Sequence, residues 1–459
     1  MATHNESQVK ELQETALENL WVYLREPSDM AEKGEPQIFV EGKGVHVTDA
    51  LGRTFIDAMS GLWLKNVGYG QTEIAEAAYQ QMLKITYMPL GTTTEPAVRL
   101  AEKVASITPG DLTRCFFTSG GSESNETAMK LSRAYFKRIG EPSRYKFISR
   151  RGSYHGATFG TLALGGTAGF PKVDYEPLLD GSYHVPQPNP YRCEFGGETP
   201  EECAELCVGA IENEIKFQGP QTVAAVVAEP ISSPYGAVVP GPNYWPMLRE
   251  VCDRYGVLLI ADEVITGFGR TGKMFACEHW GVTPDIMTMA KGITSGYIPM
   301  GGAILRKPIA DAFIGSAGAA FRHVITFGGH PVASAAALKN IEIMEREGMV
   351  ENSAAMGSYL LDGLKELKEK HPIIGDVRGL GLMCGMELVK DRKTKEYFPP
   401  EANLAPRLTQ GFNDNGILLR GGDAMNIMPP LCVNTGEIDD ILLVMDQVIG
   451  DTAKELGAD

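Results

Sequence analysis

The sequence predicts an α/β fold, with a large domain around a mainly parallel sheet and a smaller α+β domain built from both termini. Through the middle of the chain, short apolar runs alternate with helical patterns, which is typical of parallel strands joined by crossover helices. On either side of this region the alternation stops. We therefore expect residues 1–64 to form an arm and part of the small domain, residues 65–330 the large domain, and residues 331–459 the rest of the small domain.

The N-terminal segment combines a helical arm with short strands. Apolar residues recur at helical spacing, so we expect an amphipathic helix; they are Leu12, Leu17, Leu20, Trp21 and Leu24. Strands at 37–40, 45–47 and 53–57 follow, separated by glycine-containing turns. The start of the chain lacks the basic residues and continuous apolar core of a signal peptide or a membrane span.

The middle region supplies the central sheet. Helical periodicity is expected at 72–85, 95–107 and 122–138. The expected strands are 114–118, 145–149, 222–228, 257–261, 286–290 and 302–305, with further helices between them.

The C-terminal region mixes helices and strands without the regular alternation. Apolar residues spaced for one helical face predict helices at 333–346, 353–368 and 406–415. Strands are expected at 377–380, 382–387 and 417–420. We expect the N-terminal strands to join this second unit.

Composition narrows the class of protein. The formal net charge of −16 over 459 residues argues against nucleic acid or an anionic membrane as a partner. The eight cysteines contain no C-x-x-C pair, and the eight histidines show no metal-ligand spacing. We therefore expect free thiols in a reducing cytoplasm and no metal site.

Charged residues follow two apolar runs that read as buried strands. Asp262 and Glu263 end the run 257–261, and Lys291 ends the run 286–290. Open α/β sheets bind ligands at the carboxyl ends of their strands. A lysine desolvated there can have a lowered pKa and act as a Schiff-base nucleophile. The alternative is an ordinary surface ion pair.

The glycines between these charges resemble a nucleotide-binding loop. Residues 267–272 spell G-x-G-x-x-G, and residues 267–273 spell G-x-x-x-x-G-K. A dinucleotide fingerprint needs a helix to open there, but no helical periodicity follows. A phosphate loop needs Ser or Thr after the lysine, where this chain has Met274. A nucleotide-binding protein using this loop remains the alternative from another functional class.

The stretch Thr118–Asn125 joins an expected strand to an expected helix and contains Gly120, Gly121 and Ser122. Glycines there allow backbone amides to face a ligand at the helix N-terminus, where the macrodipole attracts an anion. Helix capping alone would explain the serine, but not two glycines with flanking hydroxyls. We interpret the stretch as a phosphate-binding cup.

Two further candidates depend on their surroundings. In Tyr154-His155-Gly156, an aromatic ring followed by a small residue could stack on a flat ligand. Arg420 follows an expected strand, and its planar guanidinium suits a carboxylate. Packing and a surface ion pair are the respective alternatives.

A lysine able to form an imine, a carboxylate on a neighbouring strand end and a phosphate cup are what pyridoxal phosphate requires. With these features the sequence resembles the class III aminotransferases of pyridoxal-phosphate fold type I, and among them the ω-transaminases of amine:pyruvate type. The resemblance covers essentially the whole chain. The run LLIADEVITGFGRTGKMFACEHWGVTPDIMTMAKG from Leu258 to Gly292 carries it, together with TSGGSESNETAMK, YHG, AEP at 228–230 and TFGGHP at 326–331.

The resemblance implies a pyridoxal phosphate site. Lys291 would form the imine and shuttle the proton, and Asp262 would keep the pyridine nitrogen protonated. The other implied contacts are Val264 and Tyr154 on the two ring faces, Gly120, Gly121 and Ser122 around the phosphate, His155 as a further cofactor contact, and Glu229 near the ring substituents.

It also implies a dimer and a substrate pocket. Thr326 is similar to the threonine that binds the phosphate of the partner subunit's cofactor, so a homodimer, or a tetramer, is expected. Arg420 matches a mobile arginine that grips a substrate carboxylate, and Trp63 resembles the aromatic that meets the amine's side group. Tyr23 and Met88 match the same pocket more loosely.

The implied reaction is ping-pong transfer of an amino group from a primary amine or ω-amino acid to an oxo acid such as pyruvate. An aminomutase or a decarboxylase-like enzyme would share the fold and the cofactor. A non-catalytic binding protein would not need the lysine, the carboxylate and the phosphate cup together.

Overall fold

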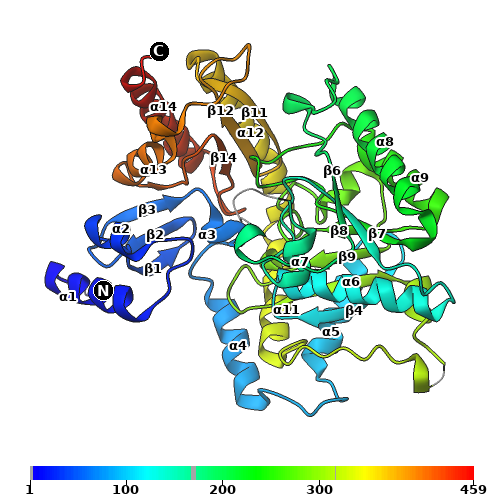
Figure 1. The fold of residues 1–459 in the computed structure, drawn as a ribbon. Coiled ribbons are helices and arrows are strands. Elements are labelled where there is room, and N and C mark those ends of the chain that lie inside the picture. The colour runs from blue at the N-terminus through cyan, green and yellow to red at the C-terminus, as the bar shows by residue number, and fades with distance from the viewer. Residues whose placement is uncertain (1–3, 167–171, 316, 459) are drawn as a thin grey trace.

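A computed structural model describes residues 4–166, 172–315 and 317–458 (Figure 1). Its centre is a seven-stranded sheet with the order β4-β10-β9-β8-β7-β5-β6. The strands are β4 (Leu112–Thr118), β5 (Lys146–Arg150), β6 (Ser182–Val185), β7 (Val223–Ala228), β8 (Leu258–Asp262), β9 (Ile286–Met289) and β10 (Gly301–Arg306). All pairs from β9 to β6 are parallel, and only β10 runs antiparallel to its neighbours β9 and β4. The predicted α/β class with a mainly parallel sheet is confirmed.

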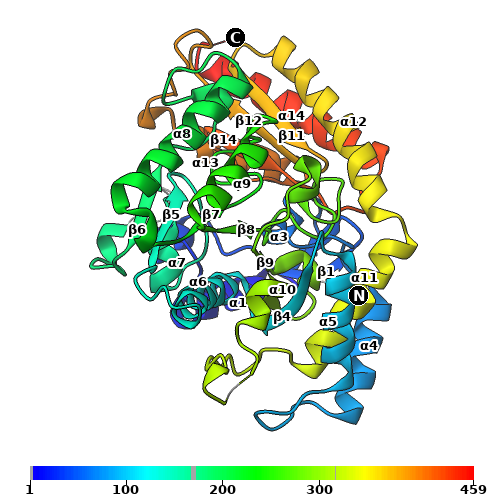
Figure 2. The same cartoon turned by 90° about the vertical axis from the view of Figure 1, so that its right-hand side faces the viewer.

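Helices cover both faces of this sheet. Every residue of β7 and β8 is buried, as expected for strands enclosed on two sides. Alternate strand residues point to opposite faces, so Leu259 packs in one apolar cluster and Ile260 in another. The first cluster includes residues of α8 (Pro200–Gln218) and α9 (Tyr244–Tyr255), and the second includes residues of α6 (Gly121–Arg138). Figure 2 shows α8 and α9 on one side of the central strands and α6 on the other.

Two smaller sheets hold the remaining strands. One has the order β1-β2-β3-β13, and β13 lies parallel to β3, so segments from both ends of the chain share it. The other is antiparallel, with the order β11-β12-β14. Their strands are β1 (Phe39–Lys43), β2 (His46–Asp49), β3 (Thr54–Asp57), β11 (Ile374–Leu380), β12 (Met383–Leu388), β13 (Ile417–Leu418) and β14 (Ala424–Ile427).

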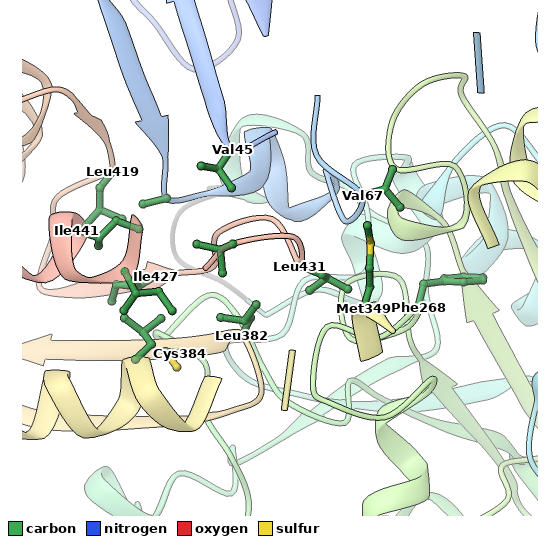
Figure 3. Packing of buried hydrophobic residues seen from close by; sticks show 14 of the residues in the cluster. Val45, Val67, Phe268, Met349, Leu382, Cys384, Leu419, Ile427, Leu431 and Ile441 are labelled. Atoms are coloured by element: carbon green, nitrogen blue, oxygen red, sulfur yellow. The ribbon is translucent and has the colours of Figure 1, made fainter. Parts of the chain in front are cut away.

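The largest apolar core joins these sheets to the rest of the molecule. Figure 3 shows Val45 from the turn between β1 and β2, Phe268 from the loop after β8 and Leu431 from the C-terminal region within one packed cluster. The other helices are α1 (Glu6–Asn19), α2 (Pro27–Glu32), α3 (Ser60–Trp63), α4 (Thr72–Lys84), α5 (Glu95–Ile107), α7 (Phe159–Leu164), α10 (Lys307–Asp311), α11 (Pro331–Arg346), α12 (Met349–Lys370), α13 (Leu404–Asp414) and α14 (Thr435–Glu455).

Several expectations need correction. The arm helix α1 ends at Asn19, so Trp21 and Leu24 lie beyond it and are exposed. The sequence did not predict β6, β14 or α14. No described helix is both long and apolar enough to cross a bilayer.

Candidate active site

The carboxyl ends of the parallel strands meet at one cavity of about 150 Å³. Asp262 is the last residue of β8, Glu229 directly follows β7, and Lys291 stands two residues beyond β9. The cavity brings together eight of the predicted cofactor residues: Gly121, Ser122, Tyr154, His155, Glu229, Asp262, Val264 and Lys291.

Asp262 is a buried carboxylate held in one orientation. Its Oδ2 accepts hydrogen bonds from Asn125 Nδ2 at 2.8 Å and lies 2.7 Å from His155 Nδ1. Its Oδ1 accepts from the Val264 amide at 3.1 Å and from Thr288 Oγ1 at 3.3 Å. Polar groups therefore contact both oxygens of the carboxylate and fix its orientation. The side chain can therefore present a fixed negative charge to a cationic ring nitrogen.

Lys291 also lies on the cavity wall, in a backbone conformation that non-glycine residues rarely adopt, with φ of 47°. Part of the residue's surface remains open to the cavity, but protein surrounds its ammonium group. The pKa of Lys291 is lowered to about 8, chiefly because the ammonium is buried; Asp262 raises the pKa and Arg270 lowers it, both by less than burial does. The structure thus contains a lysine that is partly neutral near neutral pH.

The N-terminus of α6 faces the same cavity. The helix begins at Gly121 without a side-chain cap, which leaves amides of its first turn available for an anion. A Cβ on Gly121 would lie 2.9 Å from Val264 Cγ1, so glycine allows the helix to approach that side chain. Ser122 Oγ accepts from the Ala157 amide at 3.1 Å. Gly120 precedes the helix, and a Cβ there would meet open space.

Glu229 positions the main chain at Tyr154. One carboxylate oxygen accepts from the Tyr154 amide at 3.1 Å, and the other pairs with Arg150 Nη2 at 2.7 Å. Arg150 is 1% exposed and Glu229 is 6% exposed. Since both charges are buried, removing either one would leave the other unpaired, which is costly. The pair therefore fixes the segment that carries the Tyr154 ring.

A second hollow of about 310 Å³ adjoins the first and shares Leu62, Tyr154 and Lys291 with it. Trp63 and Arg420 also line it. The Lys291 ammonium lies 5.0 Å from the centroid of the Trp63 ring. Among the described residues, no carboxylate lies within salt-bridge distance of Arg420, so its guanidinium is available to an anionic group.

Three other predicted site residues lie apart from these hollows. Tyr23 is 89% exposed, and neither Tyr23 nor Met88 lines either hollow. Thr326 is exposed on a loop, where its carbonyl oxygen accepts from the Tyr87 hydroxyl at 2.6 Å. Their assigned roles stay predictions.

The residues around Asp262 include two that the sequence did not single out. Asn125 donates to Asp262 and to the His155 carbonyl, and it accepts from Thr288. Its position, one turn after Gly121 on α6, was the available signal.

The Gly267–Lys273 loop forms turns followed by a short 3₁₀ helix, Ala276–Trp280, so the α-helix that a dinucleotide-binding loop requires is missing there.

The donor set fits pyridoxal phosphate. The cavity offers a lysine of lowered pKa for the aldehyde, a fixed carboxylate for the ring nitrogen and an uncapped helix N-terminus for the phosphate. His155 Nε2, at the cavity wall, is buried without a hydrogen-bond partner among the described residues.

Comparisons with known proteins agree with this geometry. The model of the family "Aminotransferase class-III" matches residues 30–449. The chain is 38% identical to a putrescine–pyruvate aminotransferase of Pseudomonas aeruginosa, with 92% of each chain covered. It is 39% identical to a taurine–pyruvate aminotransferase of Bilophila wadsworthia, with 92% of this chain and 94% of the relative covered.

The chain is also similar to solved structures of ω-transaminases. An (S)-enantioselective ω-transaminase from Thermomicrobium roseum superposes with a TM-score of 0.92 at 40% identity, covering 98% of this chain and all of that one. The ω-transaminase of Pseudomonas jessenii in complex with PMP has a TM-score of 0.92 at 35% identity, covering 97% of this chain and 99% of that one.

Proposed function

Because this chain belongs to the class III aminotransferase family, we propose that it transfers the amino group of a primary amine or ω-amino acid to pyruvate. Class III aminotransferases depend on pyridoxal phosphate. The observation that carries the proposal is one cavity in which Lys291, Asp262 and the uncapped start of α6 converge. The glycine loop does not support the alternative of nucleotide binding, because no α-helix begins at it.

Each part of the cavity has a role in holding pyridoxal phosphate. Asp262 would hold the protonated ring nitrogen, and the amides at Gly121 and Ser122, together with Gly120, would hold the phosphate. Val264 and Tyr154, which both line the cavity, would enclose the ring, while His155 contacts Asp262 and Glu229 fixes the Tyr154 segment. When bound, the cofactor supplies an aldehyde that captures amines and a ring that accepts electrons from the substrate carbon.

Lys291 is the acid–base group. With a pKa of about 8, its Nζ can accept a proton from the substrate carbon at physiological pH and then release it to a different atom, as the transfer requires. General acid–base catalysis of this kind commonly contributes ~10²–10⁴-fold to the rate. The ring of Trp63 lies 5.0 Å from the ammonium, and both residues line the second hollow.

The second hollow receives the substrates. Trp63, Leu62 and Met59 give it an apolar wall for the side group of an amine, and Arg420 offers a bidentate partner for the carboxylate of pyruvate. The putrescine and taurine enzymes that this chain resembles are pyruvate aminotransferases by name, which supports the choice of acceptor. Tyr23 and Met88 have no part in this wall as described.

We further propose a homodimer in the cytoplasm. Large apolar side chains are exposed on α4, on the loop after it and beside Thr326; they are Tyr79, Met82, Leu83, Leu90, Val324 and Phe327. Such a surface on a soluble chain fits burial against a second copy. Thr326 lies within this surface, where it could reach the phosphate in the partner's site.

The proposed location in the cytoplasm rests on the cysteines. The thiols of all eight are free, which fits a reducing compartment.

The test is a panel of amine donors with pyruvate as the acceptor. Purified protein supplied with pyridoxal phosphate should release an oxo product and alanine in equal amounts, with the parallel-line kinetics of a ping-pong mechanism. An aminomutase would release no oxo product, and a decarboxylase-like enzyme would release carbon dioxide without alanine. Either result would refute the transaminase proposal.

A further inference from the structure

Arg270, in the glycine loop after β8, is a fully buried cation outside the cofactor contacts. The residue is 0% exposed, and no described carboxylate lies within salt-bridge distance of it. Its Nη1 donates to the carbonyl oxygens of Leu382 and Pro429, in the C-terminal part of the chain. Its Nη2 donates to Ser60 Oγ at 3.1 Å and to Asn66 Oδ1 at 2.9 Å. One side chain therefore ties three distant segments together.

The glycines of this loop explain how the arginine reaches that position. Gly269 and Gly272 have φ of 88° and 81°, in the region that favours glycine. A Cβ on Gly272 would lie 2.9 Å from Ala354 Cβ, and one on Gly269 would lie 3.0 Å from a Leu431 methyl. The loop is thus pressed against α12 and against the segment before α14. The G-x-G-x-x-G pattern serves close packing rather than nucleotide binding.

The segment held by Nη2 contains a strained turn. It is the short element α3, whose backbone at Gly61 and Leu62 is not helical, and it is called the Ser60–Trp63 turn below. Ser60, Gly61 and Trp63 all have positive φ, of 51°, 67° and 58°. Two of them are not glycine, and such conformations persist only when the surroundings enforce them. Asp57 holds the start of the turn by accepting from the Met59 and Gly61 amides. Ser60 Oγ holds the other side, donating to the Met428 carbonyl at 2.6 Å while accepting from Arg270.

The same turn presents Trp63 to the substrate hollow. The indole lies against the Lys291 ammonium, and Leu62 lines both hollows. Asn66, just after the turn, accepts from Arg270 and donates to the Phe268 carbonyl at 2.6 Å. The far end of the turn is therefore fastened to the glycine loop at two points.

We propose that Arg270 is a positioning residue that holds the Ser60–Trp63 turn through Ser60 and Asn66 and so places Trp63 against Lys291 and the amine. The proposal rests on the transaminase function for its kinetic consequences, and on geometry alone for the placement of Trp63. A displacement of about 1 Å in a positioning group can cost ~10²-fold in rate. Loss of Arg270 should therefore impair the amine half-reaction through Trp63.

The test is a double-mutant cycle between Arg270→Met and Trp63→Phe, measured on the holoenzyme. All four proteins are compared at a pH above the Lys291 midpoint of each, because Arg270 also lowers the pKa of Lys291 and that effect does not pass through Trp63. With Trp63 present, Arg270→Met should lower kcat/KM for an aromatic amine by about 10- to 100-fold. In the Trp63→Phe background the same change should cost no more than about threefold, because the positioned group is already gone. Additive losses would overturn the proposal, because a merely structural arginine would weaken both backgrounds equally.

A matched pair of serine variants covers the case in which Arg270→Met fails to fold. Ser60→Ala removes the acceptor on the turn, whereas Ser353→Ala removes a hydroxyl that donates to the Arg270 carbonyl at 3.0 Å on the opposite side of the loop. The loss of kcat/KM caused by Ser60→Ala should be smaller when Trp63→Phe is also present. The effect of Ser353→Ala on kcat/KM should be the same with and without Trp63→Phe. Equal behaviour of the two serines would contradict the assignment.

Fluorescence supplies a readout that does not require turnover. Adding pyridoxal phosphate to the apoenzyme should quench tryptophan emission, and the difference in quenching between the native chain and Trp63→Phe isolates Trp63. The same difference is then measured between each variant and its Trp63→Phe double variant. It should be smaller in the Arg270→Met and Ser60→Ala backgrounds and unchanged in the Ser353→Ala background. An unchanged difference in Ser60→Ala would refute the placement of Trp63 even if the enzyme proves not to be a transaminase.

Discussion

The lowered pKa of Lys291 predicts an unusual pH dependence for cofactor capture. A lysine reacts with an aldehyde only in its neutral form. With a pKa of about 8, about 24% of Lys291 is neutral at pH 7.5, whereas at the ordinary value of 10.5 only about 0.1% would be. The structure thus increases the reactive fraction about 240-fold. Because the folded pKa is lowered, reactivity should rise with pH and level off above about 8.

The assay mixes apoenzyme with a fixed concentration of pyridoxal phosphate in a stopped-flow instrument from pH 6.5 to 10. The rate at which the visible absorbance band appears is plotted against pH after correction for the free cofactor's own titration. Arg270 lowers the pKa of Lys291, so Arg270→Met should move the midpoint upward. The control Arg249→Met removes an arginine that pairs with Asp285 and does not line the cavity, so it should leave the midpoint in place. A native midpoint near 10.5 would refute the reasoning.

Three further variants test the cavity. Lys291→Ala should lose the visible band and all turnover while keeping its fold by circular dichroism; turnover within tenfold of the native enzyme would exclude the assignment. Asp262→Asn should retain cofactor poorly on dialysis and slow the amine half-reaction by at least ~10²-fold, because the ring nitrogen loses its anionic partner; a native half-reaction rate would contradict that role. Arg420→Ala should raise KM for pyruvate by at least about tenfold and leave KM for a carboxylate-free amine within about twofold, and equal changes in both would count against it.

Most of the candidate residues named from the sequence lie around one cavity, because they follow the ends of strands. Asp262 and Lys291 are consecutive strand ends in a parallel sheet, so the rule that places ligands there brought them together before any contact was known. The same rule could not reveal Asn125 as a partner of Asp262, because the two are 137 residues apart and meet only through packing of α6 on the sheet. Arg270 was missed for the same reason, since its acceptors come from three distant segments.

The misses in the fold have local causes. Strand β6 has only four residues, Ser182–Val185, and just its last residue is fully buried, so its sequence lacks the apolar run that marked β7. Helix α14 had a readable start, because Asn434 and Glu437 form a capping box ahead of Ile438 and Ile441. That helix could have been predicted, whereas β6 forms because β5 offers it a paired edge.

The requirement for arginine at position 270 follows from a comparison with Lys291. Burial lowers the pKa of Arg270 to about 10, so its guanidinium stays charged at neutral pH. Burial in the same protein interior lowers the pKa of Lys291 to about 8, so this lysine can lose its proton near neutral pH. A lysine has a lower ordinary pKa than arginine, so the same burial would leave less of it charged. It also lacks the planar set of donors that serves Ser60, Asn66, Leu382 and Pro429 together. One stretch thus carries two buried cations with opposite requirements: the arginine must stay charged to hold the turn, and the lysine must be able to lose its proton.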